Sequence, residues 1–280
     1  MHAMLNIAVR AARAAANIIM RYSDRVDRLT VAKKGFNEFV TQLDKQAEQT
    51  IIDILLKAYP GHGILGEESG YRKGNDYVWI IDPLDGTTNY IHGFPQFSIS
   101  IALAYKGRLD QAVVYAPLRE ELFTATRGEG AKLNDRRIRV SRCNDLGNSL
   151  LGTEFSYQGF ERIDNYLSIY KTFLTTSAGI RQTGSVALDL ASVAAGRFDG
   201  FWEFGLKTWD MAAGVLLIRE AGGIVSDLRG TNDYLRSKNI IVGNPRIHKA
   251  MTQIIRLYEC FFTTETIDNP NYDDILSSRE

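Results

Sequence analysis

Residues 77–89 read YVWIIDPLDGTTN. The first five, from Tyr77 to Ile81, form an apolar run rich in strand-forming residues, which predicts a buried strand closed by Asp82-Pro83. Apolar and alternating segments follow it, with a hairpin signal at Lys106-Gly107. Further strands are expected at 97–103, 111–115 and 122–125. The stretch therefore predicts one strand of an antiparallel meander that fills roughly residues 77–140.

Helical patterns lie on both sides of this meander. Residues 3–22 are rich in alanine and carry apolar side chains at helical spacing, and a second such segment over 43–59 ends at Pro60-Gly61. Downstream, helices are expected at 164–174, 184–196, 209–221 and 247–261, and strands at 200–204, 224–225 and 240–242. This mixture of helices and strands predicts an α/β protein.

The composition narrows the class of protein. Hydrophobic residues make up 45% and charged residues 24% of the 280 residues, which is ordinary for a globular chain. The 33 basic residues balance the 33 acidic ones, so no overall field favours nucleic acid or an anionic membrane. The two cysteines, Cys143 and Cys260, give no disulfide framework. No apolar run approaches ~18 residues, so we expect a soluble, cytoplasmic protein without a membrane segment.

Two aspartates frame the turn after the predicted strand. Proline holds this turn rigid, so the side chains of Asp82 and Asp85 can converge while the Leu84 carbonyl points the same way. Gly86 lets the backbone approach a ligand closely. The segment that begins at Thr87 offers free amides for a phosphate. The competing interpretation is ordinary helix punctuation by a capping aspartate and a turn aspartate.

Two further acidic motifs point to a metal. Gly66-Glu67-Glu68-Ser69 lies in a predicted loop between helix and strand, and Trp209-Asp210 opens a predicted helix. Oxygen ligands without histidine or cysteine favour Mg²⁺ over Zn²⁺, and the four histidines are scattered along the chain. A carboxylate that bridges two Mg²⁺ ions ~3.5–4 Å apart stabilises the attacking and leaving oxygens of phosphoryl transfer. The acidic motifs therefore indicate a magnesium-dependent phosphoryl-transfer site.

The three motifs together resemble those of the inositol monophosphatase family. They are Gly66-Glu67-Glu68-Ser69, Asp82-Pro83-Leu84-Asp85-Gly86-Thr87-Thr88-Asn89 and Trp209-Asp210-Met211-Ala212-Ala213-Gly214. The likeness runs from the first residues to about Ala250. It implies an α/β fold in which helical and sheet layers alternate as an αβαβα sandwich. It also implies a single domain over 1–262 with two halves meeting at the metal site. The resemblance does not cover residues 263–280, whose polar composition predicts a disordered tail.

The resemblance assigns metal ligands residue by residue. On the family pattern, Glu67, Asp82 and the Leu84 carbonyl hold the first metal. Asp82, Asp85 and Asp210 hold the second, with Asp82 bridging. Glu67 also contacts a third, loosely held Mg²⁺. Glu68 does not bind metal but contacts and orients the residues that do.

The resemblance also assigns residues to catalysis and substrate binding. Asp44 and Thr87 orient the attacking water, with Glu67 completing the catalytic set. Glu203 contacts the substrate hydroxyls, with a surface charge at a strand end as the alternative. The full substrate-binding set is Asp85, Gly86, Thr87, Thr88, Gly184, Ser185, Val186, Glu203 and Asp210. Relatives usually carry alanine where Val186 stands, so its branched side chain is expected to affect the substrate pocket. Lys33-Lys34-Gly35 is similar to a mobile basic loop near the third metal, with a solvated charge pair as the alternative.

The function implied by the resemblance is Mg²⁺-dependent hydrolysis of a phosphate monoester. Inositol 1-phosphate is the best single substrate, cleaved to myo-inositol and phosphate by activated water without a covalent intermediate. Lithium inhibition and a homodimer are implied as well. Bisphosphate nucleotidases and fructose bisphosphatases share the metal motif and stay as alternatives. Some members of the family act with RNA polymerase or NusA in ribosomal RNA antitermination and ribosome biogenesis, which is an alternative of a different class.

Overall fold

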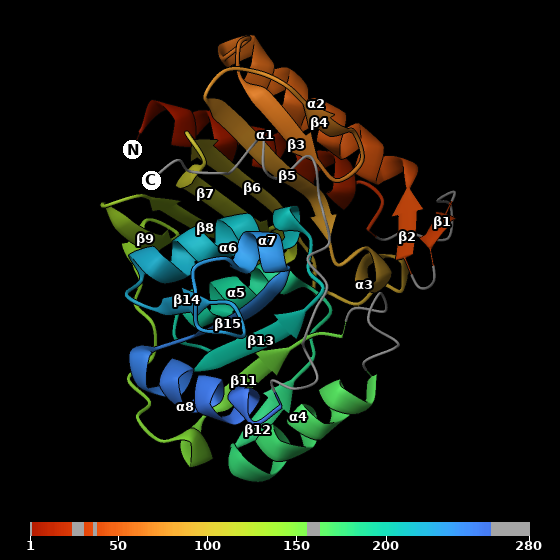
Figure 1. Cartoon of the computed structure of the whole chain (residues 1–280). Coiled ribbons are helices and arrows are strands. Elements are labelled where there is room, and N and C mark those ends of the chain that lie inside the picture. Colours follow the sequence, from red (N-terminus) through yellow and green to blue (C-terminus); the bar gives the residue numbers. More distant parts are fainter. Residues whose placement is uncertain (1, 24–30, 36–37, 156–162, 259–280) are drawn as a thin grey trace.

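The computed structural model describes residues 2–23, 31–35, 38–155 and 163–258. Five layers follow one another from top to bottom in Figure 1: two helices, a large sheet, two helices, a smaller sheet and two outer helices. The predicted αβαβα sandwich is therefore confirmed. The predicted tail over 263–280 lies outside the described residues.

The large sheet has eight strands in the order β10-β9-β8-β7-β6-β5-β3-β4. Their bounds are β3 Gly63–Gly66, β4 Gly70–Arg72, β5 Tyr77–Asp85, β6 Ser98–Tyr105, β7 Arg108–Ala116, β8 Glu121–Thr126, β9 Gly130–Leu133 and β10 Arg136–Arg137. Neighbours from β5 to β10 pair antiparallel, as the meander prediction requires. Only β3 runs parallel to β5. A short η2 helix, Pro117–Arg119, joins β7 to β8.

The smaller sheet has five strands in the order β12-β11-β13-β15-β14. Their bounds are β11 Leu150–Thr153, β12 Gly179–Arg181, β13 Gly200–Phe204, β14 Ile224–Ser226 and β15 Asn239–Gly243. β11 pairs parallel with β12 and β13, whereas β15 pairs antiparallel with β13 and β14. A separate hairpin of β1 Val31–Gly35 and β2 Glu38–Thr41 leads into the second helix.

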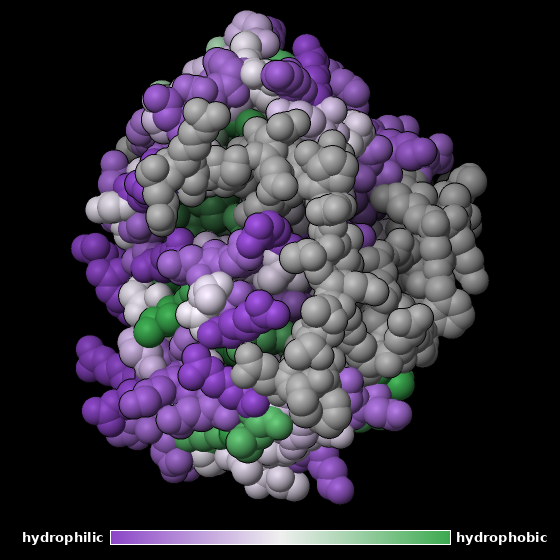
Figure 2. All heavy atoms as spheres, in the orientation of Figure 1, coloured by the Kyte–Doolittle hydropathy of each residue, from purple (hydrophilic) through white to green (hydrophobic). Residues whose placement is uncertain are grey.

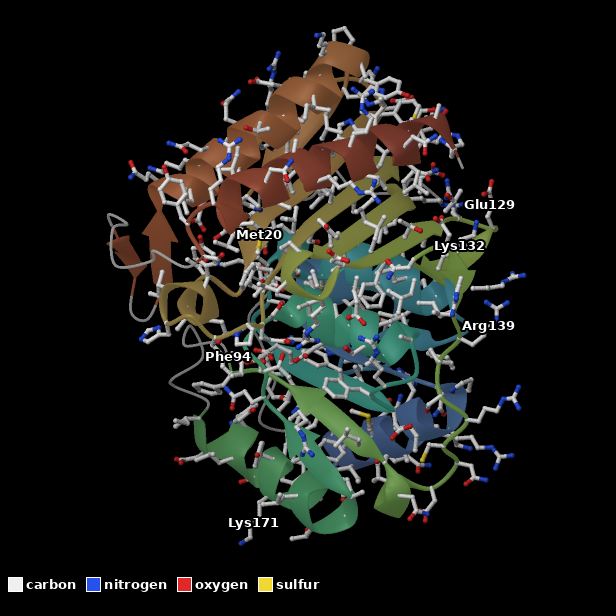
Figure 3. All side chains as sticks on the ribbon, turned by 180° about the vertical axis from the view of Figure 1, so that it is seen from behind. Met20, Phe94, Glu129, Lys132, Arg139 and Lys171 are labelled. Atoms are coloured by element: carbon white, nitrogen blue, oxygen red, sulfur yellow. The ribbon has the colours of Figure 1, made fainter. Side chains whose placement is uncertain are left out.

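The helices α1 Ala3–Met20 and α2 Gln42–Ala58 cover the outer face of the large sheet. Figure 3 shows α1 crossing in front of the strands, with Met20 labelled at its end. Among the described helices, α1 is long and apolar enough to pass a membrane-span test by length and composition. Its alanine face is nevertheless buried in a shared core with α2 and the sheet, which is the packing expected of a core helix.

The helices α5 Val186–Ala194 and α6 Thr208–Glu220 lie between the two sheets. Their side chains join apolar residues of both sheets in one hydrophobic cluster. Gly214 in α6 lies against α5 so closely that an added Cβ would approach Leu190 Cβ to 2.4 Å. The middle layer is therefore held at a spacing that a glycine sets.

The helices α4 Ile163–Thr176 and α8 Pro245–Arg256 cover the outer face of the smaller sheet. Phe173 of α4 and Ile247 of α8 pack with the buried Trp202 of β13. Three short helices complete the described chain: α3 Thr87–Ile91, η3 Leu146–Asn148 and α7 Tyr234–Ser237. Figure 2 shows mostly hydrophilic residues over the coloured part of one face, with small separate hydrophobic patches.

The predicted helices and the meander are present, with several corrections at their edges. β5 continues through Pro83 to Asp85, because a register shift between Asp82 and Asp85 accommodates the proline. The segment 66–69 turns between two strands, β3 and β4, rather than linking a helix to a strand. Lys33-Lys34-Gly35 lies in β1 instead of a loop, and the closing helix stops at Arg256. The strands β1, β3 and β4 are too short for their sequences to show a periodic pattern.

The α5–α6 contact gives a stability prediction. We expect Gly214→Ala to lower the free energy of unfolding by about 1–3 kcal/mol, because the new methyl group overlaps Leu190 in a filled core. Urea unfolding followed by circular dichroism measures this change. Gly147→Ala is the matched control, since the nearest atom to its added Cβ lies at an ordinary 3.5 Å. Equal stability of the two variants would contradict the packing argument.

Candidate metal centre

The candidate centre lies where β5 ends. Asp82 pairs in register with Ser100 of β6 and Asp85 with Ser98, so the two residues between them on β5 lie opposite one residue of β6. This bulge changes the direction of the chain between Asp82 and Asp85, at the end of a buried strand. The next residue, Gly86, has a φ of +92°, and a Cβ there would come within 2.9 Å of the Gln96 carbonyl oxygen. Glycine is therefore required for the chain to enter α3.

Asp85 is held by four donors from two elements. The hydroxyls of Ser185 and Ser98 donate to its Oδ2, and so does the Ala187 amide at 2.9 Å. The Val186 amide donates to Oδ1 at 3.2 Å. Burial raises the pKa of Asp85 to about 6, while these hydrogen bonds oppose the rise. The first amides of α5 thus bind the carboxylate as helix N-termini bind anions.

Asp82 lies within the electrostatic reach of three other carboxylates. Burial raises the pKa of Asp82 well above its usual value, and the charges of Glu67, Asp85 and Asp210 raise it further. Its Oδ1 accepts the Leu84 amide at 3.0 Å. The three other carboxylates that the sequence motifs single out are therefore near enough to act on Asp82 electrostatically.

Asp210 and Glu67 approach Asp82 from different parts of the chain. Asp210 is in the first turn of α6, and its Oδ2 accepts the Lys207 amide at 2.7 Å. Burial raises its pKa well above the usual value, although this hydrogen bond opposes the rise. Glu67 is in the β3–β4 turn, and its amide donates to the Ile81 carbonyl at 3.1 Å, which ties the turn to β5. Asp210 thus caps the start of α6 through the Lys207 amide.

Several of these carboxylates accept hydrogen bonds from backbone amides. In the ranges given above, no three His, Cys, Asp or Glu side chains stand close enough to hold a metal ion as they lie. Like charges repel in a medium of low dielectric constant, and Asp82, Asp85 and Asp210 each accept a hydrogen bond from a backbone amide. The chemistry of the group nevertheless fits a hard divalent cation, because all of its donors are oxygens and a cation would offset their repulsion.

Thr87 and Asp44 meet beside this group, as predicted. Thr87 Oγ1 lies 3.1 Å from Asp44 Oδ1 and 2.9 Å from the Leu84 carbonyl oxygen. A hydroxyl carries one proton, so Thr87 donates to one of these two acceptors at a time. Asp44 lies in the first turn of α2 and is only 1% exposed. α2 therefore positions the threonine that follows the β5 turn.

Glu203 is buried rather than a surface charge at a strand end, so that alternative is wrong. It lies in β13, is 1% exposed, and its Oε2 has no hydrogen-bond partner among the described residues. Burial raises the pKa of Glu203 well above its usual value, and the nearby charge of Glu154 raises it further. Its neutral form is thus favoured more than that of an exposed glutamate.

Two acidic residues near Glu203 were not predicted from the sequence. Glu154 accepts the Gly184 amide, and burial raises its pKa to about 7. Asp189 Oδ1 accepts the Thr183 hydroxyl at 2.6 Å, while its Oδ2 has no partner among the described residues. A charged residue inside the apolar pattern of α5 was a usable signal for Asp189. Glu154 follows a short strand and carries no local signal.

The remaining predicted residues have varied surroundings. The Val186 side chain packs against the hydrophobic cluster between the sheets, while its amide faces Asp85. Thr88 lies in α3, where its carbonyl is 2.8 Å from Nδ1 of the exposed His92. His62 stacks between Tyr59 and Tyr77, with ring centroids 4.8 Å away on each side. The buried His62 is thus part of an aromatic stack, whereas His92 is exposed at the end of α3.

The buried carboxylates give a pH prediction for protein stripped of divalent cations. The folded state keeps the Glu154 proton up to about pH 7, whereas the unfolded chain loses it near pH 4.5. The free energy of unfolding therefore falls as pH rises through this window. We expect Glu154→Gln to reduce that fall by on the order of 2 kcal/mol, measured by urea unfolding in EDTA from pH 5 to 8. Asp164→Asn, an exposed change in α4, is the control and should follow the wild type. If Glu154→Gln loses as much stability between pH 5 and 8 as the wild type does, the prediction is contradicted.

Comparison with known proteins identifies the family. Residues 1–259 match the family model described as "Inositol monophosphatase family". A relative named Nus factor SuhB, from Pseudomonas aeruginosa, is 52% identical over 262 residues, which cover 91% of this chain and 97% of that protein. The extragenic suppressor protein suhB from Bartonella henselae has a similar structure, with a TM-score of 0.89 and 45% identity over 91% of this chain and 99% of that one. The inositol monophosphatase from Anabaena matches with a TM-score of 0.82 and 39% identity, over 90% and 95% of the two chains. This chain belongs to the inositol monophosphatase family.

Proposed function

We propose that the protein is a phosphatase that hydrolyses inositol 1-phosphate or a closely related phosphorylated polyol with Mg²⁺. The observation that carries this proposal is that the charges of Glu67, Asp85 and Asp210 all act on Asp82 at the end of β5, while Asp44 and Thr87 are hydrogen-bonded to each other nearby. Family membership supports a phosphatase. The specific substrate, inositol 1-phosphate, is part of our proposal.

The ligands would be divided between two positions. Glu67, Asp82 and the Leu84 carbonyl would hold one Mg²⁺, with Glu67 also near a third ion. Asp82, Asp85 and Asp210 would hold the other. Bound magnesium would supply charge neutralisation of the phosphate and a water that is acidic enough to lose a proton near neutral pH. The raised pKa of Asp82, Asp85 and Asp210 supports these roles, because groups crowded in this way gain most from a cation.

Thr87 and Asp44 would orient the attacking water. When the Thr87 hydroxyl donates its hydrogen bond to Asp44, the lone pairs of the threonine oxygen are directed away from Asp44 and can accept a hydrogen bond from water. The amides of Gly86, Thr87 and Thr88, at the entry to α3, would bind phosphate oxygens. The chain needs no nucleophilic side chain for this reaction, and we propose direct attack by water.

The polyol would lie toward the smaller sheet. Among the described residues, Glu203 has a buried carboxylate oxygen without a partner, which can accept a hydrogen bond from a substrate hydroxyl. The segment Gly184–Val186 is adjacent to Asp85, so it would line the same space. We also propose inhibition by lithium, a homodimer and a cytosolic location. We propose that 1–262 acts as one domain, since a single hydrophobic cluster joins the two sheets.

A phosphate-release assay tests this function. We expect inositol 1-phosphate to release phosphate only with Mg²⁺, and more efficiently than adenosine 3′,5′-bisphosphate or fructose 1,6-bisphosphate at the same Mg²⁺ concentration. Asp85→Asn should lower kcat by about 1000-fold or more, because it removes a ligand charge from the centre. Asp164→Asn in α4 should keep the wild-type rate. Turnover in Asp85→Asn at the wild-type rate would contradict the assignment.

A second function is supported by the 52% identity to a protein named Nus factor SuhB. We propose that a surface of this chain also binds RNA polymerase or NusA in antitermination, independently of hydrolysis. The Asp85→Asn variant separates the two functions. We expect it to retain purified NusA or RNA polymerase in a pull-down as the wild type does, and loss of binding would tie the association to the metal centre.

A further inference from the structure

Glu48 is a buried carboxylate that the proposed function does not use. It lies on α2, one helical turn after Asp44, and is 2% exposed. Its Oε2 accepts the Glu68 amide at 2.9 Å, and its Oε1 accepts the Ser69 amide at 2.7 Å. Both oxygens are thus engaged by the β3–β4 turn, 20 and 21 residues further along the chain. This is the turn that carries Glu67.

Backbone hydrogen bonds tie the β3–β4 turn to β5 and to α2. β3 pairs with β5 only as far as Gly66, opposite Ile81, and the Glu67 amide makes the last bond to that strand. β4 is three residues long, pairs antiparallel with β3, and packs Tyr71 against the hydrophobic cluster between the sheets. The next two amides, of Glu68 and Ser69, donate to Glu48. Three successive amides of the turn are therefore fixed, one by β5 and two by α2.

Gly66 fits this arrangement closely. An added Cβ would lie 2.6 Å from Glu48 Oε2 and 2.6 Å from Ser69 Oγ. The backbone of Gly66 carries no left-handed φ, so the conformation itself does not require glycine. Glycine is required because the Glu48 carboxylate occupies the space that a side chain would take.

We propose that Glu48 is a positioning residue, whose carboxylate holds the β3–β4 turn so that Glu67 faces Asp82. One turn earlier on the same helix, Asp44 contacts Thr87 in the loop after β5. α2 therefore fixes both segments that carry candidate ligands of the first metal. This inference rests on the proposed metal centre and assigns to Glu48 the alignment of Glu67 with the rest of it.

Titration of the cation-free protein with MnCl₂, followed by electron paramagnetic resonance, tests the proposal. In Glu48→Gln, the side-chain amide keeps one acceptor but places an N–H against a backbone N–H. We expect the Kd for Mn²⁺ to rise about 10-fold or more, as for other residues that orient metal ligands. The Mg²⁺ concentration for half-maximal phosphate release should rise with it, while the rate at saturating Mg²⁺ recovers most of the wild-type value. Asp53→Asn, an exposed change on the same helix, should leave both quantities unchanged.

A second variant tests the same proposal if Glu48→Gln folds poorly. Gly66→Ala keeps the Glu48 charge but displaces its carboxylate, and it should weaken Mn²⁺ binding in the same direction. A merely structural role for Glu48 would lower the melting temperature without changing the Kd for Mn²⁺, and that result would overturn the inference. Wild-type protein that neither binds Mn²⁺ nor releases phosphate would overturn the proposed function, and the inference with it. Wild-type activity with an unchanged Kd in both variants would overturn the inference alone.

Discussion

The candidate centre depends on holding several carboxylates near one another at the end of β5, where they are largely removed from water. Asp82 and Asp85 are buried and Asp210 is partly buried, and the charge of Glu67 acts on Asp82 and Asp210. Each buried carboxylate costs free energy unless donors or a cation stabilise it. The fold supplies backbone amides from the first turn of α5 and the residue before α6. These donors orient the carboxylates without neutralising them, so the group retains a strong affinity for positive charge.

The layered architecture explains how distant segments meet at one place. β5 lies inside the large sheet, and its end reaches the middle layer, where α5 and α6 begin. α2 lies on the opposite face of the same sheet and presents Asp44 and Glu48 to the loops at the end of β5 and β3. The centre is thus held from both faces of one sheet. By contrast, Glu129, Lys132 and Arg139, labelled in Figure 3, lie along the edge opposite Phe94, which follows α3.

Much of this arrangement could be predicted from the sequence, because its long elements are periodic and its acidic motifs are local. The meander, α1, α2 and the middle helices follow directly from such patterns. The route of β5 through Pro83 could not be predicted, since it depends on a bulge against β6. Glu48 and Glu154 were missed for a related reason: their partners are backbone amides 20 or more residues away. Asp44 was identified by resemblance, whereas its neighbour one turn later had no motif to mark it.

The central claim is that these separated acidic segments form one binding place for divalent cations. Crystals soaked in MnCl₂ and measured for anomalous scattering test it directly. The account predicts anomalous density among Glu67, Asp82, Asp85 and Asp210, with the Leu84 carbonyl within coordination distance. Density elsewhere, or carboxylates that remain turned to their amides at saturating Mn²⁺, would contradict it.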